Sequence, residues 1–277
     1  MNSPLMLCAR QELLLALRSR WTQIFALVFA VLALAVAASG YVLSGGSGVQ
    51  DFSRTTASLV QLVMLLVPLT SLVIGVLSLA PDRGAAELLF SQPIKRRSIL
   101  LGKLLGLFEA LVAAQAVGFG AAGVVIFSRS GGDGLGSFLL LVLGSASLTA
   151  VFLGIAAVVT AGGATRRRPR ALAVALVVWF VAVLLFDVAA LGVASLLPSG
   201  TASRFLIVSV LANPVDAVRT GALLGAEGTA AFGAASLAFF RFTGGSSRAV
   251  MMITASVLVW IVVPTVLAVR RLTRTDL

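Results

Sequence analysis

Six long apolar runs, separated by charged stretches, dominate this sequence. They lie at residues 21–43, 56–80, 98–127, 137–160, 172–197 and 249–269. At about 1.5 Å per residue, each run can cross about 30 Å of hydrocarbon as a helix. Charged residues make up only 11% of the 277 positions, whereas a soluble domain has about 25%. We therefore predict one all-α integral membrane domain over residues 1–277, with six transmembrane helices.

The basic residues indicate which ends of these helices face the cytoplasm. The chain has 21 Lys and Arg and a net charge of +11, and most of these cations flank apolar runs. They form no basic face interleaved with aromatic residues, so nucleic acid is not an expected partner. Fifteen of the 21 fall before the first run, in the second and fourth connections with their helix starts, and after the last run. Because Lys and Arg are retained on the cytoplasmic side, both termini are predicted to be cytoplasmic.

The residue types present exclude several kinds of chemistry. The sequence has no histidine, and Cys8 is its single cysteine. An internal disulfide and a His/Cys metal site are therefore excluded within this chain, and no metal ligands are expected. Gly102-Lys103 has neither the upstream glycine nor the following hydroxyl residue of a phosphate-binding loop. The chain is not expected to hydrolyse ATP by itself, or to be an enzyme.

Residues 5–20 precede the first run and approximate helical periodicity. Leu5, Cys8, Leu13 and Leu17 fall near one face, and Arg10, Glu12 and Arg18 fall elsewhere. This pattern predicts an amphipathic elbow helix in the membrane interface. A plain extension of the first span is the alternative.

Residues 198–248 form a long connection on the predicted outer, extracytoplasmic side. Pro214 and many glycines interrupt it, which predicts short helices in a re-entrant region that dips partly into the bilayer. A seventh span is disfavoured, because it would place the basic C-terminal tail outside. The connection contains one polar cluster, namely Asn213, Pro214, Asp216 and Arg219. Asn213 is expected to cap a helix that begins at Pro214, with Asp216 in its first turn; docking of an outer partner is the alternative.

Two carboxylates, Glu109 and Asp187, lie inside apolar runs. A buried ionised carboxylate is costly and normally faces a partner or water. Each is therefore either a gate, relay or lock between helices, or a structural hydrogen-bonding group or protonated acid. Gly102 and Gly106 form a small-xxx-small pair suited to close helix packing, with a dimer contact as one alternative.

The second connection leads into the stretch ELLFSQPIKRRSILLGKLLG at residues 87–106. Asp82 can cap a helix, the Ala-Ala-Glu-Leu-Leu run favours one, and Pro93 ends it. A short amphipathic helix is therefore predicted over 82–93, on the cytoplasmic face. A charged connector that only obeys topology is the alternative.

The order of residues in this connection resembles the one between spans two and three of type-2 ABC transporter permeases, and the resemblance extends over the whole chain. It implies six spans, an elbow helix, a coupling helix that contacts a separate cytoplasmic ATPase, and an outer re-entrant region. It also implies a dimer, with ATP and Mg bound by the ATPase. By residue matching, the coupling element would consist of Asp82, Gly84, Glu87, Leu88, Leu89, Pro93 and Ile94, followed at its rim by Lys95, Arg96 and Arg97.

Within this family, three stretches are similar to the NosY-like permeases of nitrous-oxide reductase maturation: ILLGK at 99–103, VWFVAVLLFDVAALG at 178–192 and LANPVDAVR at 211–219. The similarity implies a homodimer in the bacterial inner membrane, with membrane lipid around it. It further implies a periplasmic NosD-like partner and a role in assembling a copper centre. An exporter of lipid, drug or peptide is the alternative within the family. A non-transporting membrane scaffold or a secondary carrier is the alternative outside it.

Overall fold

A computed structural model describes residues 3–42, 49–80, 95–130, 134–161, 168–227 and 234–274. Every regular element in these ranges is a helix, and six helical segments are long and apolar enough to cross a membrane. These segments are α2 (Arg20–Val42), α3 (Val49–Leu79), α5 (Arg96–Ser130), α6 (Leu135–Thr160), the continuous run of α7 (Arg168–Phe180), the π-helix η2 (Val181–Leu185) and α8 (Phe186–Ser195), and α12 (Ser246–Arg274). The predicted all-α fold with six apolar spans is confirmed.

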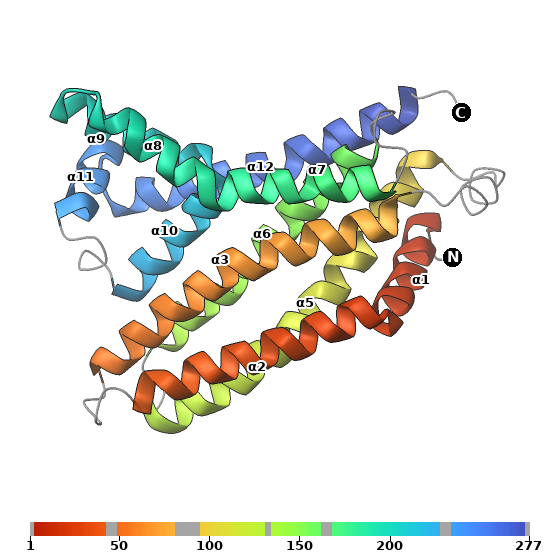
Figure 1. Ribbon diagram of the computed structural model, residues 1–277, viewed down its shortest axis with the longest axis horizontal. Coiled ribbons are helices and arrows are strands. Elements are labelled where there is room, and N and C mark those ends of the chain that lie inside the picture. Colours follow the sequence, from red (N-terminus) through yellow and green to blue (C-terminus); the bar gives the residue numbers. More distant parts are fainter. Residues whose placement is uncertain are drawn as a thin grey trace.

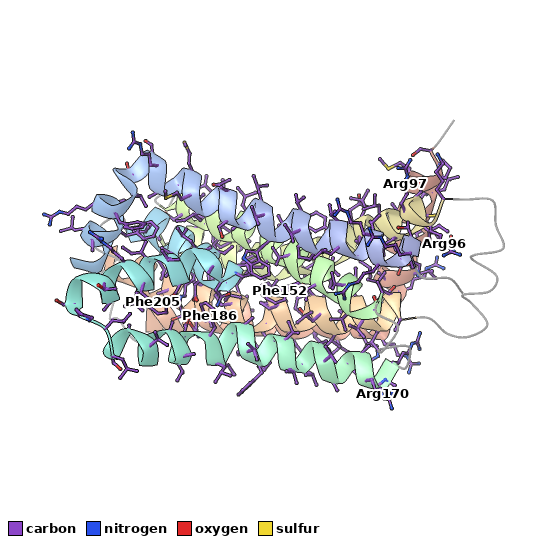
Figure 2. The ribbon with its side chains drawn as sticks, turned by 90° about the horizontal axis from the view of Figure 1, so that it is seen from above. Arg96, Arg97, Phe152, Arg170, Phe186 and Phe205 are labelled. Carbon is purple, nitrogen blue, oxygen red and sulfur yellow. The ribbon has the colours of Figure 1, made fainter. Side chains whose placement is uncertain are left out.

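The long helices lie side by side, and the shorter helices gather at the two ends of the bundle (Figure 1). Helix α1 (Pro4–Arg18) and the C-terminal end of α12 lie at one end, and α9 (Ser199–Ala212) and α11 (Ala234–Thr243) lie at the other. Arg96, Arg97 and Arg170 gather at the end with the termini (Figure 2). Which end faces the cytoplasm stays a prediction from the distribution of cations.

The core lies where α3, α5 and α6 meet. Leu72 of α3, Leu111 of α5 and Phe152 of α6 are all fully buried. A Cβ at Gly75 of α3 would lie 2.8 Å from the Ala156 Cβ of α6, so the absent side chain allows these two helices to approach closely. In contrast, the α7–α8 run and α12 keep many apolar side chains exposed, as expected where a helix faces lipid or another membrane chain.

Helices α9 and α10 (Pro214–Glu227) meet at an angle of 102° at Asn213. Proline cannot continue the hydrogen-bond ladder of α9, so a new helix begins at Pro214. Helix α10 then turns back into the bundle and packs against α3 and α6. The short helices predicted for 198–248 are present in the described part of that connection, and by composition α9 and α10 together could also be one broken span. The extracytoplasmic position of this connection stays a prediction.

Candidate functional site

Three polar side chains form a partly buried cluster between α1, α3 and α5, which we call the Glu12 cluster: Glu12, Ser78 and Lys103. Glu12 is only 6% exposed, and its Oε2 lies 3.5 Å from the Lys103 Nζ. The Ser78 hydroxyl donates a hydrogen bond to the Glu12 Oε1, and the Lys103 ammonium donates one to the Ser78 carbonyl at 3.3 Å. Ser78 precedes segment 81–94 and Lys103 follows it. The cluster therefore ties α1 to both helices that flank the predicted coupling segment.

The Gly102–Gly106 pair allows α1 to lie directly on α5. A Cβ at Gly102 would be 2.7 Å from the Leu5 carbonyl oxygen, and one at Gly106 would be 2.3 Å from the Ala9 carbonyl oxygen. The prediction that these glycines serve close packing is confirmed. They contact the helix of their own chain, so the dimer alternative is not needed to explain them.

The prediction for α1 is wrong for one residue. Glu12 was expected away from the apolar face, but it is 6% exposed and lies beside Ala9 and Ala16, which are 3% and 6% exposed. Leu17 was expected on the apolar face, and its 40% exposure is compatible with a face toward lipid. Small side chains let the two backbones approach, whereas the large apolar side chains of an interfacial helix face outward. The interfacial position of α1 itself stays a prediction.

Most of the predicted coupling residues, Asp82, Gly84, Glu87, Leu88, Leu89, Pro93 and Ile94, lie outside the described residues. Lys95 is exposed, and its carbonyl accepts the N–H groups of Ser98 and Ile99 at the first turn of α5. Arg96 is half-buried and Arg97 is exposed at the end of the bundle (Figure 2). These three cations thus lie at the start of the helix that carries Lys103.

A second cluster joins residues that the sequence had suggested separately, and we call it the Arg219 cluster: Asp187, Asn213, Asp216 and Arg219. The Arg219 Nη1 lies 3.0 Å from the Asp187 Oδ2, and its Nη2 lies 2.9 Å from the Asp216 Oδ1. The Asn213 amide donates to the Asp216 Oδ2 at 2.9 Å. Asp187 therefore joins span five to α10 through Arg219, and this contact is compatible with both interpretations, a lock between helices or a structural hydrogen bond.

The same cluster satisfies backbone groups at the corner between α9 and α10. Asn213 caps α10 as predicted, because its Oδ1 accepts the Val215 N–H at 3.0 Å. Its Nδ2 also donates to the Ala182 carbonyl at 2.8 Å. Ala182 belongs to η2, and a π-helix disturbs the regular carbonyl ladder of a span. In the membrane such backbone groups need a protein partner, and Asn213 supplies it.

Two carboxylates share one guanidinium in the Arg219 cluster, so the three groups carry one net negative charge when both acids are ionised. Asp216 is only 3% exposed, and both Asn213 and Arg219 hold its carboxylate. The side chains of Asp187 and Arg219 remain 34% and 33% exposed, so a further polar group can reach this pair.

Glu109 is exposed on α5, and no hydrogen bond or ion pair to it occurs within the described part of the chain. The expected structural hydrogen bond within the bundle is therefore not found there. A neighbouring buried network does exist between α5 and α6. Ser145 donates to the Gln115 Oε1 at 2.6 Å, and the Gln115 Nε2 donates to the Thr149 hydroxyl at 2.8 Å. Each of these three side chains therefore has a hydrogen-bond partner within the network.

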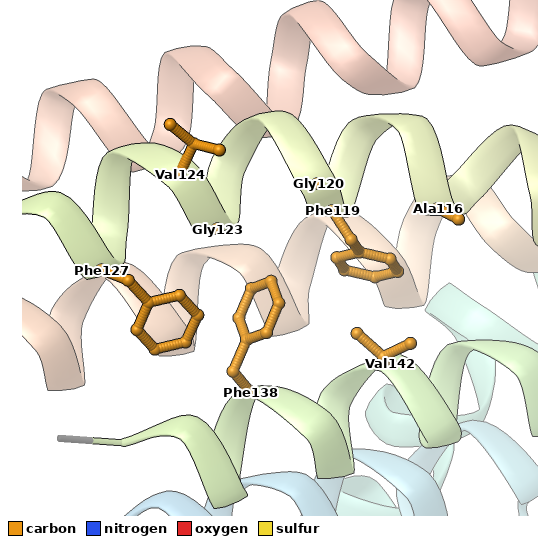
Figure 3. A pocket seen from close by; sticks show the side chains of 8 residues that line it. All are labelled: Ala116, Phe119, Gly120, Gly123, Val124, Phe127, Phe138 and Val142. Carbon is orange, nitrogen blue, oxygen red and sulfur yellow. The ribbon is translucent and has the colours of Figure 1, made fainter. Parts of the chain in front are cut away.

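An apolar pocket of about 520 Å³, largely open to the surroundings of the bundle, lies between α5 and α6, and we call it the aromatic cavity (Figure 3). Phe119, Phe127 and Phe138 line it, with the ring of Phe138 edge-on to the other two. Its lining has no charged or polar side chain. Such a cavity suits a hydrocarbon chain. Among the described residues, no group of three or more Asp, Glu, Cys or His could hold a metal ion.

Comparisons with known proteins concern almost the whole chain. Residues 6–277 match the family model described as ABC-2 family transporter protein. The chain is 36% identical to "Probable ABC transporter permease protein NosY" of Stutzerimonas stutzeri over 236 residues, which cover 83% of this chain and 85% of the relative. It is 34% identical to the protein of the same name from Pseudomonas aeruginosa, over the same shares of the two chains. The similarity therefore extends over the membrane domain and is not confined to one motif.

Proposed function

This chain belongs to the ABC-2 family of transporter proteins, as a NosY-like permease component of an ABC transporter, and from that premise we propose how it is driven. Permeases of this family work with a cytoplasmic ATPase, typically as dimers, and are not themselves the ATPase. We propose that the movement of this ATPase enters through residues 82–97, with Glu87 and Leu88 at the contact. The permease is then a homodimer in the inner membrane, with both termini in the cytoplasm.

The Glu12 cluster is the observation that carries this proposal. A displacement of segment 81–94 must move the end of α3, the start of α5, or both. Ser78 and Lys103 stand on these two helices, and both contact the Glu12 carboxylate. Because a buried carboxylate loses the compensation that these contacts give when they break, α1 is expected to move together with the two helices.

We further propose that the transporter supports assembly of the copper centre of nitrous-oxide reductase through a periplasmic NosD-like partner. The names of the relatives support a NosY system. The Arg219 cluster supports contact with a further polar group, since its charged pair remains about one-third exposed. Copper is in this proposal the cargo of the assembled system, and the chain itself need not bind it.

The test is co-purification of the permease with its ATPase, followed by measurement of ATP hydrolysis in proteoliposomes. The double variant Glu87→Ala/Leu88→Ala should uncouple the ATPase from the permease, so that the presence of the permease no longer changes the rate of ATP hydrolysis. Leu196→Ala is a matched control, because Leu196 is an apolar residue 85% exposed on a different connection. Absence of an associated ATPase, or unchanged coupling in the double variant, would contradict the assignment.

Export of a lipid is the second candidate function, and the aromatic cavity favours it, because an acyl chain fits an apolar cavity between two spans. The copper content of nitrous-oxide reductase separates the candidates. Deleting the permease should lower that content if the maturation proposal holds. Normal copper content together with altered lipid distribution would favour export.

A further inference from the structure

Accessible polar side chains lie along α3 and span five, and we call them the polar face: Ser58, Gln61, Asp187 and Arg219. The Trp179 Nε1 donates to the Leu65 carbonyl at 3.1 Å, and this hydrogen bond fixes how the two helices lie against each other. Gln61 and Ser58 come four and seven residues before Leu65, so they lie on the same side of α3. Because α3 and span five run in opposite directions (Figure 1), Gln61 is displaced from Trp179 toward Asp187.

The Asp187–Arg219 pair lies inside the apolar part of the bundle. Asp187 comes eight residues before the end of α8, which is about 12 Å along the helix. Val218, the neighbour of Arg219, packs against Gly144 of α6, where an added Cβ would lie 2.7 Å from the Val218 Cγ1. Gly144 is nine residues from the start of α6, or about 14 Å. A 26-residue helix such as α6 exceeds about 30 Å of hydrocarbon by only about 5 Å at each end. The pair is therefore several ångströms inside the hydrocarbon.

The backbone beside this pair is satisfied by protein groups, as a place in hydrocarbon requires. The carbonyls of Leu211 and Ala212, at the end of α9, accept hydrogen bonds from the side chains of Ser256 and Trp260 on α12. Carbonyls at a helix end have no partner within the helix, and lipid offers them none. In contrast, the charged pair keeps about one-third of its side-chain surface uncovered. That uncovered surface needs a polar contact from outside this chain.

Lipid tails do not supply this contact, because a charged side chain in hydrocarbon is costly and faces a partner or water. Arg219 cannot extend to the headgroups, since its two terminal nitrogens contact Asp187 and Asp216. The side chain of Asp187 is shorter than the Lys and Arg side chains that reach the interface. Gln61 is also exposed, and its side chain has no hydrogen bond within the described ranges. Water supplies both the donors and the acceptors that these groups require.

We propose that water contacts the polar face inside the membrane and reaches Gln61, Asp187 and Arg219 from the end of the bundle that carries α9 and α11. Ser58 lies nearest to that end on α3 and is the first polar group on this route. Small hydrophilic solutes can follow the water to the charged pair. This hydration requires neither the ATPase nor copper, so it can be absent while the proposed function holds.

Access of a water-soluble thiol reagent in proteoliposomes tests this hydration. Cys8→Ser removes the single native thiol, and Gln61→Cys or Val183→Cys then places one thiol at the polar face, since Val183 lies between Trp179 and Asp187. A methanethiosulfonate with a trimethylammonium group reacts with thiols in water and enters hydrocarbon poorly. Modification is followed by mass spectrometry of the intact chain.

Leu143→Cys in the same background is the matched control. Leu143 is 63% exposed on α6 and adjoins Gly144, so it lies at about the depth of the charged pair. The thiols at the polar face should react at least about tenfold faster than the Leu143→Cys thiol, because a charged reagent pays several kcal/mol to enter hydrocarbon. Thermal unfolding shows that each variant is folded, and Gln61→Cys, at an exposed position, keeps the comparison possible if Val183→Cys does not fold.

Equal rates at the polar face and at Leu143→Cys would show that lipid covers both, and would overturn the hydration. A second contrary result is a Gln61→Cys thiol that the reagent does not modify but that joins two copies through a disulfide under mild oxidation. That result would assign the uncovered surface to contact between two copies of the chain.

Discussion

Replacing Gly106 with alanine should displace α1 and open the Glu12 cluster. The added Cβ would lie 2.3 Å from the Ala9 carbonyl oxygen and 2.8 Å from the Leu13 backbone nitrogen. Both neighbours are backbone atoms, so no rotamer change can relieve the contact. Helix α1 has to move by about 1 Å or more to restore van der Waals distances of about 3.5 Å. The Glu12–Lys103 contact, already 3.5 Å long, then lengthens beyond an ion pair.

Gly120→Ala on the same helix provides the reference. A Cβ at Gly120 would meet nothing within 4 Å. Both substitutions gain helix propensity of about 1 kcal/mol, so this term cancels between them. Overpacking against a rigid neighbour costs about 1–3 kcal/mol, and the buried Glu12 loses compensation in addition. Gly106→Ala should therefore be less stable than Gly120→Ala by at least about 1–3 kcal/mol.

Thermal unfolding of both purified variants in the same lipid and detergent would measure this difference. Hydrolysis by the complex with its ATPase would be measured on the same samples, and Gly106→Ala should also lose coupling. Equal midpoints for the two variants would refute the close α1–α5 packing. A destabilised Gly106→Ala with normal coupling would instead refute the role of the Glu12 cluster in transmission.

Two further predictions concern the Arg219 cluster. Asp187→Asn should lower the copper content of nitrous-oxide reductase, while the dimer stays intact by size-exclusion chromatography. The loss of stability should be at most about 1 kcal/mol, because the Asp187–Arg219 pair is one-third exposed. Unchanged activity at normal expression would contradict this prediction. Asn213→Ala should cost about 1–3 kcal/mol in thermal unfolding, because Asn213 is buried and both the Ala182 carbonyl and the first turn of α10 lose their partner. Exposed Ser203→Ala on α9 should change the midpoint little, and equal effects would count against the capping role.

The spans could be predicted from the sequence because lipid imposes one simple requirement on them. A run of about 20 apolar residues must form a helix whose backbone is satisfied internally. Pro214 likewise marks the break between α9 and α10, since it cannot donate a backbone hydrogen bond. Asn213 was recognisable as a cap from its place before Pro214, and the structure shows its bond to the Val215 N–H.

The two clusters could not be assembled from the sequence, because they depend on which helices become neighbours. Glu12 resembled a polar residue on the solvent side of an interfacial helix. The small residues Ala9 and Ala16 on α1, together with Gly102 and Gly106 on α5, were the signal for its burial. Helix η2 was also hidden, since VAVLL at 181–185 reads as ordinary apolar helix. Its contact with Asn213 is visible only after α10 has folded back.

Helix α3 connects the Glu12 cluster to span five physically. Its Ser78 contacts the Glu12 cluster, and its Leu65 carbonyl accepts a hydrogen bond from the Trp179 Nε1 of span five, which also carries Asp187. Pro68 lies between these two contacts and interrupts the backbone ladder of α3. A displacement that reaches Ser78 therefore meets a point where α3 can bend before it meets span five. How far Pro68 lets α3 bend then decides how much movement reaches the Arg219 cluster, which makes the stiffness of α3 a part of the coupling between the two clusters.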